Sequence, residues 1–171
     1  NKAHHDLVAA VRTLRELHGD DAHLHFVGTD GPPGYRKIVE TIVTHAGMRD
    51  HVTFHGSVSQ EELVAHYVSA DVFCCLSDHE GFCVPVIEAM HHGLPVVAFD
   101  CTAVGETVGN GGLLLKDKNP LVVACALHRV SSDSGLAQRL RTAGRQRAKY
   151  FDRGITQDHF GEYLSTLLGS L

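Results

Sequence analysis

The hydrophobic pattern of this chain alternates between helical spacing and short apolar runs along almost its whole length. The run at residues 70–76 (ADVFCCL) is continuous, which is typical of a strand buried on both faces. Strands that alternate with helices of about ten residues indicate right-handed βαβ units around a parallel sheet. The sequence therefore predicts an α/β domain whose parallel sheet has helices on both faces.

The predicted elements cover most of the chain. We expect strands at 24–28, 52–54, 70–76, 95–99 and 112–115, and helices at 4–17, 35–46, 61–68, 84–92, 119–130, 133–149 and 155–168. Ser59 and Glu62 have the separation of a capping box, so they should begin the third of these helices. On the first two helices, Leu17 and Ile38 are among the apolar residues that we expect to face the core.

Length and charge restrict the class of protein. The 171 residues leave room for one domain, at roughly 150 residues per domain. The 15 basic and 20 acidic side chains give a formal charge of −5, whereas sequence-independent nucleic-acid binders need a basic surface. No apolar run approaches the roughly 20 residues of a membrane-spanning helix. We expect a cytoplasmic protein with no nucleic-acid partner.

Cysteine and histidine are both plentiful, but neither forms a known metal motif. The five cysteines include no CxxC pair, which favours free thiols in a reducing compartment. The 14 histidines contain no HExxH or similar pair. The sequence therefore predicts no metal site, and we expect no cofactor.

Ligands of parallel sheets bind beyond the carboxyl ends of the strands, so the loops after the strands are the places to search. The most informative loop precedes the helix predicted at 84–92. Pro85 suits the first turn of that helix, where a missing N–H costs nothing. The backbone amides at the helix start should be unpaired and face an anion or hydroxyl, and they belong to Gly81, Phe82, Cys83 and Val84.

Two glutamates accompany this helix start. Glu88 is one turn inside the helix, near its positive end, where a carboxylate stays ionised and can accept hydrogen bonds from two adjacent hydroxyls, as on a ribose. Glu80 precedes the helix and can face the same pocket from the loop. The ligand that suits both acids and the amides has a phosphate between two polyol ends, as a nucleotide sugar does.

The segment EGFCVPVIEAM, which contains both glutamates and is followed by GLPVVA, resembles the donor-site signature of the family 4 retaining glycosyltransferases (glycosyl transferases group 1). The resemblance runs from Asn1 to about Phe151. It includes the segments VGTDGP, VTFHGSVSQEEL, ADVFCCLS and GETVGNGGLLL in the family's order. It implies a GT-B fold, in which two Rossmann-like domains face each other across a cleft. Residues 1–171 would then form the C-terminal nucleotide-sugar-binding domain, with the N-terminal acceptor domain outside this chain.

The resemblance implies a role for each matching residue. Glu88 would bind the ribose hydroxyls, and Glu80 would lie at the donor sugar, near its reacting carbon. Lys2 would neutralise the diphosphate leaving group, and the family's partner arginine would lie a few residues before Asn1. The remaining donor contacts would come mainly from the backbone, at Gly56, Val58, Gly81, Phe82, Cys83 and Val84.

One position departs from the family pattern, because many members have glycine where this chain has Cys83. A side chain there would narrow the sugar pocket slightly, and it leaves the identity of the donor sugar open. The tail helix, within residues 152–171, would cross toward the N-terminal domain and leave part of its apolar face uncovered.

The resemblance implies transfer of a sugar from a nucleotide-diphosphate sugar to an acceptor hydroxyl, in polysaccharide or lipopolysaccharide synthesis. The chain alone would not catalyse transfer. Contact with the inner face of the membrane, if made, would come from the N-terminal half. Two alternatives share the architecture: a nucleotide-sugar epimerase and a non-catalytic nucleotide-binding module.

Overall fold

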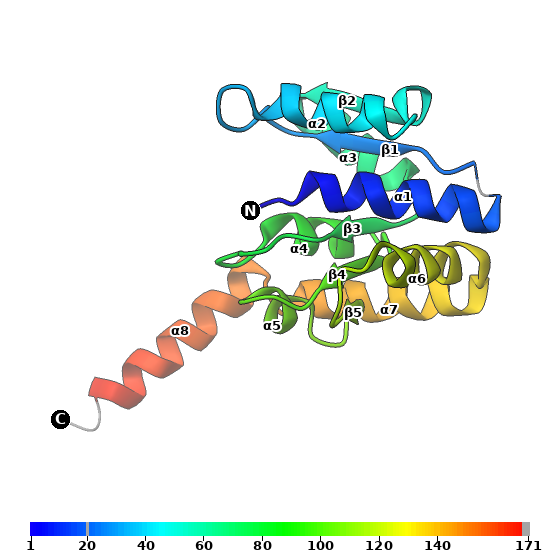
Figure 1. The fold of residues 1–171 in the computed structure, drawn as a ribbon. Helices are drawn as coiled ribbons and strands as arrows, with labels where there is room; N and C mark the ends of the chain where they lie inside the picture. Colours follow the sequence, from blue (N-terminus) through cyan, green and yellow to red (C-terminus); the bar gives the residue numbers. More distant parts are fainter. Residues whose placement is uncertain (20, 169–171) are drawn as a thin grey trace.

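The computed structural model describes residues 1–19 and 21–168, and its parallel strands are flanked by helices (Figure 1). The strands are β1 (Leu24–Val27), β2 (Val52–Gly56), β3 (Phe73–Cys75), β4 (Val96–Phe99) and β5 (Leu113–Leu115). The α-helices are α1 (His4–His18), α2 (Tyr35–His45), α3 (Gln60–Ser69), α4 (Val84–His91), α5 (Val104–Val108), α6 (Pro120–Ser132), α7 (Ser134–Lys149) and α8 (Arg153–Leu168). A short 3-10 helix, η1 (Arg49–His51), precedes β2.

All pairings between the strands are parallel. β1 pairs with β2, and β3, β4 and β5 form a second group with β4 in its centre. Parallel neighbours need a crossover connection, and helices provide it here. The predicted α/β class with parallel strands is confirmed, but the strands form two hydrogen-bonded sheets, one of two and one of three strands, where the sequence predicted one.

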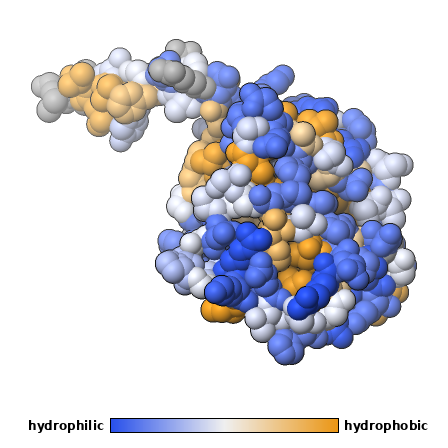
Figure 2. All heavy atoms as spheres, turned by 90° about the horizontal axis from the view of Figure 1, so that it is seen from above, coloured by the Kyte–Doolittle hydropathy of each residue, from blue (hydrophilic) through white to orange (hydrophobic). Residues whose placement is uncertain are grey.

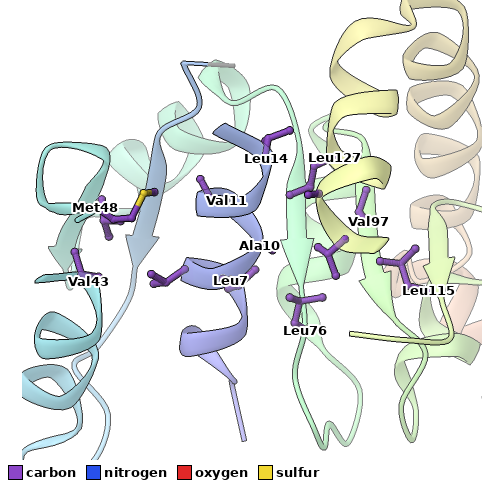
Figure 3. Close-up of a cluster of buried hydrophobic side chains, with 14 of the residues drawn as sticks. Leu7, Ala10, Val11, Leu14, Val43, Met48, Leu76, Val97, Leu115 and Leu127 are labelled. Atoms are coloured by element: carbon purple, nitrogen blue, oxygen red, sulfur yellow. The ribbon is translucent and has the colours of Figure 1, made fainter. Parts of the chain in front are cut away.

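The strand β4 is buried on both faces. The side chain of Val97 joins a core cluster with residues of α1, α2 and α6, which Figure 3 shows in close-up. The side chains of Val96 and Ala98 point the other way and join a second cluster with residues of α4, α5 and α7. All three residues are fully buried. The helices therefore cover both faces of this part of the sheet, as predicted.

The strands β1 and β2 have one apolar and one polar face. Leu24, Phe26 and Phe54 contact the core, whereas His25 and Thr53, which alternate with them, are polar. The register pairs Phe26 with Phe54 but Val27 with Gly56, so His55 is an extra residue in β2. Such a β-bulge bends the strand and changes the direction of a side chain.

The structure corrects several details of the sequence analysis. Leu17 is 54% exposed and Ile38 is 59% exposed, so the prediction that they face the core is wrong. Leu17 lies in the last turn of α1, beyond the buried residues of that helix, and α2 buries Val39 and Val43 instead of Ile38. The predicted strand at 70–76 is shorter, and α5 was not predicted.

The predicted capping box is present. The Ser59 hydroxyl accepts a hydrogen bond from the Glu62 N–H at 3.2 Å, and the Glu62 carboxylate accepts one from the Ser59 N–H at 2.8 Å. The reciprocal bonds fix the first turn of α3 directly after the loop that ends β2.

The last helix, α8, projects from the body of the domain (Figure 1). Large apolar side chains are exposed along it, and the space-filling view shows apolar atoms on this arm (Figure 2). They include Phe160, Tyr163, Leu164, Leu167 and Leu168. No helix among the described residues has both the length and the apolar character needed to cross a bilayer.

Candidate functional site

The loop between β3 and α4 carries Glu80 at the carboxyl end of the sheet. The Lys2 ammonium lies 2.7 Å from the Glu80 carboxylate. Residues next to this pair also join the N-terminus to the loop, because the Asp78 N–H donates to the Asn1 carbonyl at 2.7 Å. The Glu80 side chain is 10% exposed, whereas that of Lys2 is 48% exposed. The structure therefore brings together the two residues that the sequence predicted to be catalytic.

The environment of this pair keeps both groups charged. Burial acts to raise the pKa of Glu80, but hydrogen bonds from Lys2 and Ser77 outweigh it and hold that pKa below its ordinary value. Burial acts to lower the pKa of Lys2, and the hydrogen bond and charge of Glu80 outweigh it, so that pKa is raised. The pair therefore has no net charge, and its more exposed member is the Lys2 ammonium, which could still contact an anionic ligand.

Thr102 holds the backbone of Glu80 from a neighbouring loop. The Glu80 N–H donates to the Thr102 hydroxyl oxygen at 2.9 Å, and that hydroxyl donates to the Glu80 carbonyl at 2.7 Å. One turn further along this segment, the Thr107 hydroxyl donates to the Phe82 carbonyl at 2.7 Å. The sequence analysis missed both threonines, because no local pattern links them to a loop more than 20 residues away.

Lys118 ties the same loop to α1. Its ammonium lies 2.8 Å from the Asp6 carboxylate and also contacts the Asp78 carboxylate and the Leu76 carbonyl. One cation therefore joins the end of β3, the loop after it and the first helix.

The start of α4 has the geometry that the sequence predicted. Cys83 is the residue before the helix, and Pro85 lies in its first turn. Within the described chain, no group accepts a hydrogen bond from the N–H of Gly81, Phe82 or Cys83. These amides and the positive end of the helix are available to an anion or a hydroxyl.

Backbone strain is concentrated around this site. Among the described residues, Ala3, Cys83 and Thr102 are the only non-glycine residues with a positive φ, at 48°, 63° and 39°. Ala3 follows Lys2, Cys83 begins α4, and Thr102 binds Glu80. Such conformations cost roughly 1–3 kcal/mol each and occur preferentially at functional sites.

Glu88 is held by a residue that the sequence analysis did not identify. The hydroxyl of Tyr67, near the end of α3, donates to the Glu88 carboxylate at 2.9 Å. Tyr67 is buried, and burial together with the hydrogen bond to Glu88 raises its pKa. The tyrosine therefore remains a donor, and it fixes one oxygen of the Glu88 carboxylate.

The side chain of Cys83 faces the interior. It is 5% exposed, and its sulfur lies 3.7 Å from the sulfur of Cys75. The sulfur atoms of both residues and one Glu80 oxygen lie within 4.8 Å of one another. The bulk that distinguishes Cys83 from a glycine thus takes up space beside Cys75, and little of it reaches the surface. All five cysteines are free, as predicted.

Gly56 and Val58 lie at the edge formed by β1 and β2. The Gly56 carbonyl accepts a hydrogen bond from the Gly28 N–H at 2.9 Å, which joins the loops after these two strands. Gly56 has a φ of 69°, a conformation that glycine adopts without strain. Val58 is half-buried in the loop that leads to α3.

An apolar groove of about 740 Å³ lies on the other side of the α4 start. Its lining includes Phe82, Val84, Ile87, Phe151 and Phe160, so it joins α4 to the beginning of α8. The Phe82 ring contacts the Phe151 ring edge-on, with centroids 5.4 Å apart. The side chain of Phe82 thus takes part in this groove, whereas its amide belongs to the helix start.

Comparisons with known proteins define the family. Residues 1–147 match the family of glycosyl transferases group 1, and the chain belongs to this family. A GDP-mannose-dependent α-(1-6)-phosphatidylinositol monomannoside mannosyltransferase of Mycobacterium tuberculosis is 34% identical over 154 residues, which cover 85% of this chain and 39% of the relative. The chain thus spans well under half of the length of this relative.

Solved structures confirm the fold. The sucrose-phosphate synthase of Thermosynechococcus elongatus superposes with a TM-score of 0.83 at 28% identity, over 99% of this chain and 43% of that one. Anabaena Alr3699/HepE, solved with UDP and glucose, superposes with a TM-score of 0.84 at 23% identity, over 96% of this chain and 45% of that one. The domain therefore has the architecture of one Rossmann-like half of the GT-B fold.

Proposed function

We propose that this chain is the C-terminal, donor-binding domain of a retaining glycosyltransferase that moves a sugar from a nucleotide-diphosphate sugar to an acceptor hydroxyl. The observation that carries this proposal is the Lys2–Glu80 pair beside the open amides of the α4 start. A cation, oriented N–H groups and a helix N-terminus together suit a diphosphate. Glu88, fixed by Tyr67, suits the ribose hydroxyls of the same ligand.

The chemistry follows from where charge develops. The bond between the anomeric carbon and the diphosphate oxygen breaks, and its electron pair leaves with the diphosphate. The acceptor oxygen forms the new bond on the same face, and its proton passes to the departing phosphate. Lys2 and the amides of Gly81–Val84 stabilise the leaving group, which is the protein's main task in such a step. Glu80 stabilises the positive charge that develops on the sugar ring.

The second domain of the enzyme would supply the acceptor site. The exposed apolar residues of α8 and the groove lined by Phe82 and Phe160 support this part of the proposal, because a chain of this kind buries such surface against another domain. The chain alone therefore binds donor and transfers nothing. The acceptor that we propose is a growing polysaccharide or glycolipid, in keeping with the phosphatidylinositol mannoside in the name of the mycobacterial relative.

Titration of the purified chain with GDP, UDP and ADP, followed by NMR, tests donor binding. GDP comes first because the mycobacterial relative is named for GDP-mannose. We expect saturable shifts that begin at the amides of Gly81–Val84. Unchanged spectra at millimolar concentrations of all three nucleotides would contradict the proposal.

Two variants test the separate roles of the acids. Glu88→Ala should weaken nucleotide binding more than Glu80→Ala, because Glu88 is assigned to the ribose and Glu80 to the sugar. Glu61→Ala, at an exposed position on α3, is the matched control and should bind as the wild type does. In the full-length enzyme, Glu80→Ala should abolish transfer but keep nucleotide binding. Retained transfer would remove Glu80 from the mechanism.

A further inference from the structure

Three histidines from three different elements converge on the polar face of β1 and β2. One ring nitrogen each from His25 on β1, His55 on β2 and His66 on α3 lies within 4.8 Å of the other two. Nδ1 of His25 lies 2.9 Å from Nε2 of His55, and the rings of His55 and His66 have centroids 4.2 Å apart. None of these residues belongs to the predicted donor contacts. We name them the histidine cluster.

The fold brings the three residues together through strand alternation and the bulge. His25 alternates with Leu24 and Phe26, which contact the core, so its ring is on the opposite face of β1. His55 is the extra residue of β2 and lies against that ring. The helix α3 passes over this face, and its capping box fixes the turn that leads to His66. Parallel pairing and a capped helix therefore hold the cluster on rigid elements.

The three imidazole nitrogens of the histidine cluster are ligand atoms that fit a transition-metal cation. Imidazole nitrogens suit Zn²⁺, Cu²⁺ and Ni²⁺. A tetrahedral zinc site with Zn–N bonds of about 2.0–2.1 Å places its ligand atoms about 3.3 Å apart. The present separations, from 2.9 Å up to at most 4.8 Å, include that value, so small side-chain rotations would complete the set.

We propose that the histidine cluster binds one divalent transition-metal cation, of which Zn²⁺ is the type, with a fourth coordination position open to water or an external ligand. The cation would join β1, β2 and α3, and because it binds only the folded chain it would stabilise the domain. The proposal does not depend on the transferase function.

Among the residues that the structure describes, one other group of potential ligands is present. The sulfur atoms of Cys75 and Cys83 and a Glu80 oxygen are also within 4.8 Å of one another. That group is less suited to a cation, because the Lys2 ammonium already occupies the Glu80 carboxylate. It provides the alternative that the experiment must distinguish.

The test is titration of the chelator-treated chain with Zn²⁺ in a calorimeter and with Co²⁺ in a spectrometer. We expect one equivalent of Zn²⁺ to bind and to raise the unfolding temperature. Bound Co²⁺ should show d–d absorption without a thiolate charge-transfer band. His66→Ala and, separately, His25→Ala should weaken binding at least tenfold and abolish the rise in unfolding temperature. His45→Ala, at an exposed position on α2, and Cys83→Ser should bind as the wild type does.

Several results would overturn the proposal. One is the absence of saturable binding of Zn²⁺ at concentrations up to about 1 mM, which corresponds to a free energy of only about −4 kcal/mol. A thiolate band that disappears in Cys83→Ser would place the metal at the cysteines. Equal weakening in His45→Ala and His66→Ala would show unspecific binding to surface histidines. Circular dichroism of each variant confirms that a lost signal is not lost folding.

Discussion

The two groups of strands are stabilised in different ways. β4 has apolar neighbours on both faces, and its residues Val96, Val97 and Ala98 are fully buried. β1 and β2 contact the core through one face only, and the other face carries polar side chains and the histidine cluster. The loop that carries Glu80 thus follows the more buried group of strands, whereas the predicted donor contacts at Gly56 and Val58 follow the less buried one.

The loops that follow these strands also differ, because the loop after β3 is held by more distant segments of the chain than the loop after β1. The loop after β3 is bound by Lys2, Thr102, Thr107 and Lys118, which come from three distant segments. The loop after β1 is held mainly by the bond between Gly28 and Gly56 and by an ion pair between Asp30 and Arg36 at 2.9 Å. A loop held from several sides can keep its side chains in fixed positions, whereas a loop with fewer contacts can adapt its shape to a ligand.

The largest difference in the free energy of unfolding should appear when one leucine in each of the two groups of strands is shortened to alanine. Leu76 follows β3 and is fully buried, and Leu24 on β1 is half-buried. Leu76→Ala should lower the free energy of unfolding by about 3–5 kcal/mol, the range for a fully buried leucine that leaves a cavity. Leu24→Ala should cost about 1–2 kcal/mol, since less apolar surface is lost. Urea denaturation measures both, and equal losses would contradict the comparison.

The next largest effect should come from Lys118, whose ammonium group binds the loop after β3. Lys118→Met removes the partner of two carboxylates and leaves Asp6 and Asp78 near each other. We expect a loss of about 1–2 kcal/mol in the free energy of unfolding, because a half-buried charge loses its partner. Lys116→Met is the control, as Lys116 pairs with Asp100 at an exposed position, and it should change stability by less than about 0.5 kcal/mol. A larger loss of stability in Lys116→Met would show that the ion pairs of Lys118 stabilise the domain no more than an exposed ion pair does.

The stability of the β1–β2 group should depend more on local interactions, such as the capping box at the start of α3. Ser59→Ala removes the capping box at the start of α3, and such losses cost about 1 kcal/mol. Ser57→Ala, two residues earlier and exposed, should be neutral. Hydrogen exchange should show faster exchange along α3 in the first variant, with β4 unchanged. Faster exchange in β4 as well would mean that the two groups unfold together.

The smallest effect is the pH dependence of the Lys2–Glu80 pair. The pKa of Glu80 is lowered from its ordinary 4.5, so its contribution to stability is present above that value and is lost as the pH falls through the lower, folded-state pKa. The pKa of Lys2 is raised above 10.5, so its contribution is present below that value and is lost as the pH rises through the folded-state pKa.

Glu80→Gln should therefore be less stable than the wild type by about 0.5–1 kcal/mol near neutral pH. The difference should disappear in acid, which urea denaturation at several pH values measures. A difference that grows as the pH falls below 4.5 would have the wrong sign and would disprove the pairing.

Much of the fold could be predicted from the sequence because its signals are local. The continuous apolar runs indicated the buried strands, and Ser59 with Glu62 indicated a helix start that the structure confirms. Ile38 was misplaced because α2 has more apolar residues than its buried face can hold, and spacing alone does not show which of them face inward. The short helix α5 carries too few residues for a periodic pattern to appear.

The candidate site likewise contains residues that the sequence could identify and residues that it could not. The residues within one segment, from Glu80 to Glu88, were identifiable from the loop, the proline and the helix start. Tyr67 and Thr102 were not, because their roles depend on contacts across 21 and 22 positions of sequence. The histidine cluster was missed for a further reason: its members lie on two neighbouring strands and a crossing helix, and no linear spacing corresponds to that arrangement.

The contact between the first two residues and the loop after β3 has a practical consequence. Asn1 accepts a hydrogen bond from Asp78 and its side-chain amide donates to the His79 carbonyl, and Lys2 binds Glu80. Any segment joined directly before Asn1 would therefore lie beside the candidate site and would have to leave the Lys2–Glu80 contact intact.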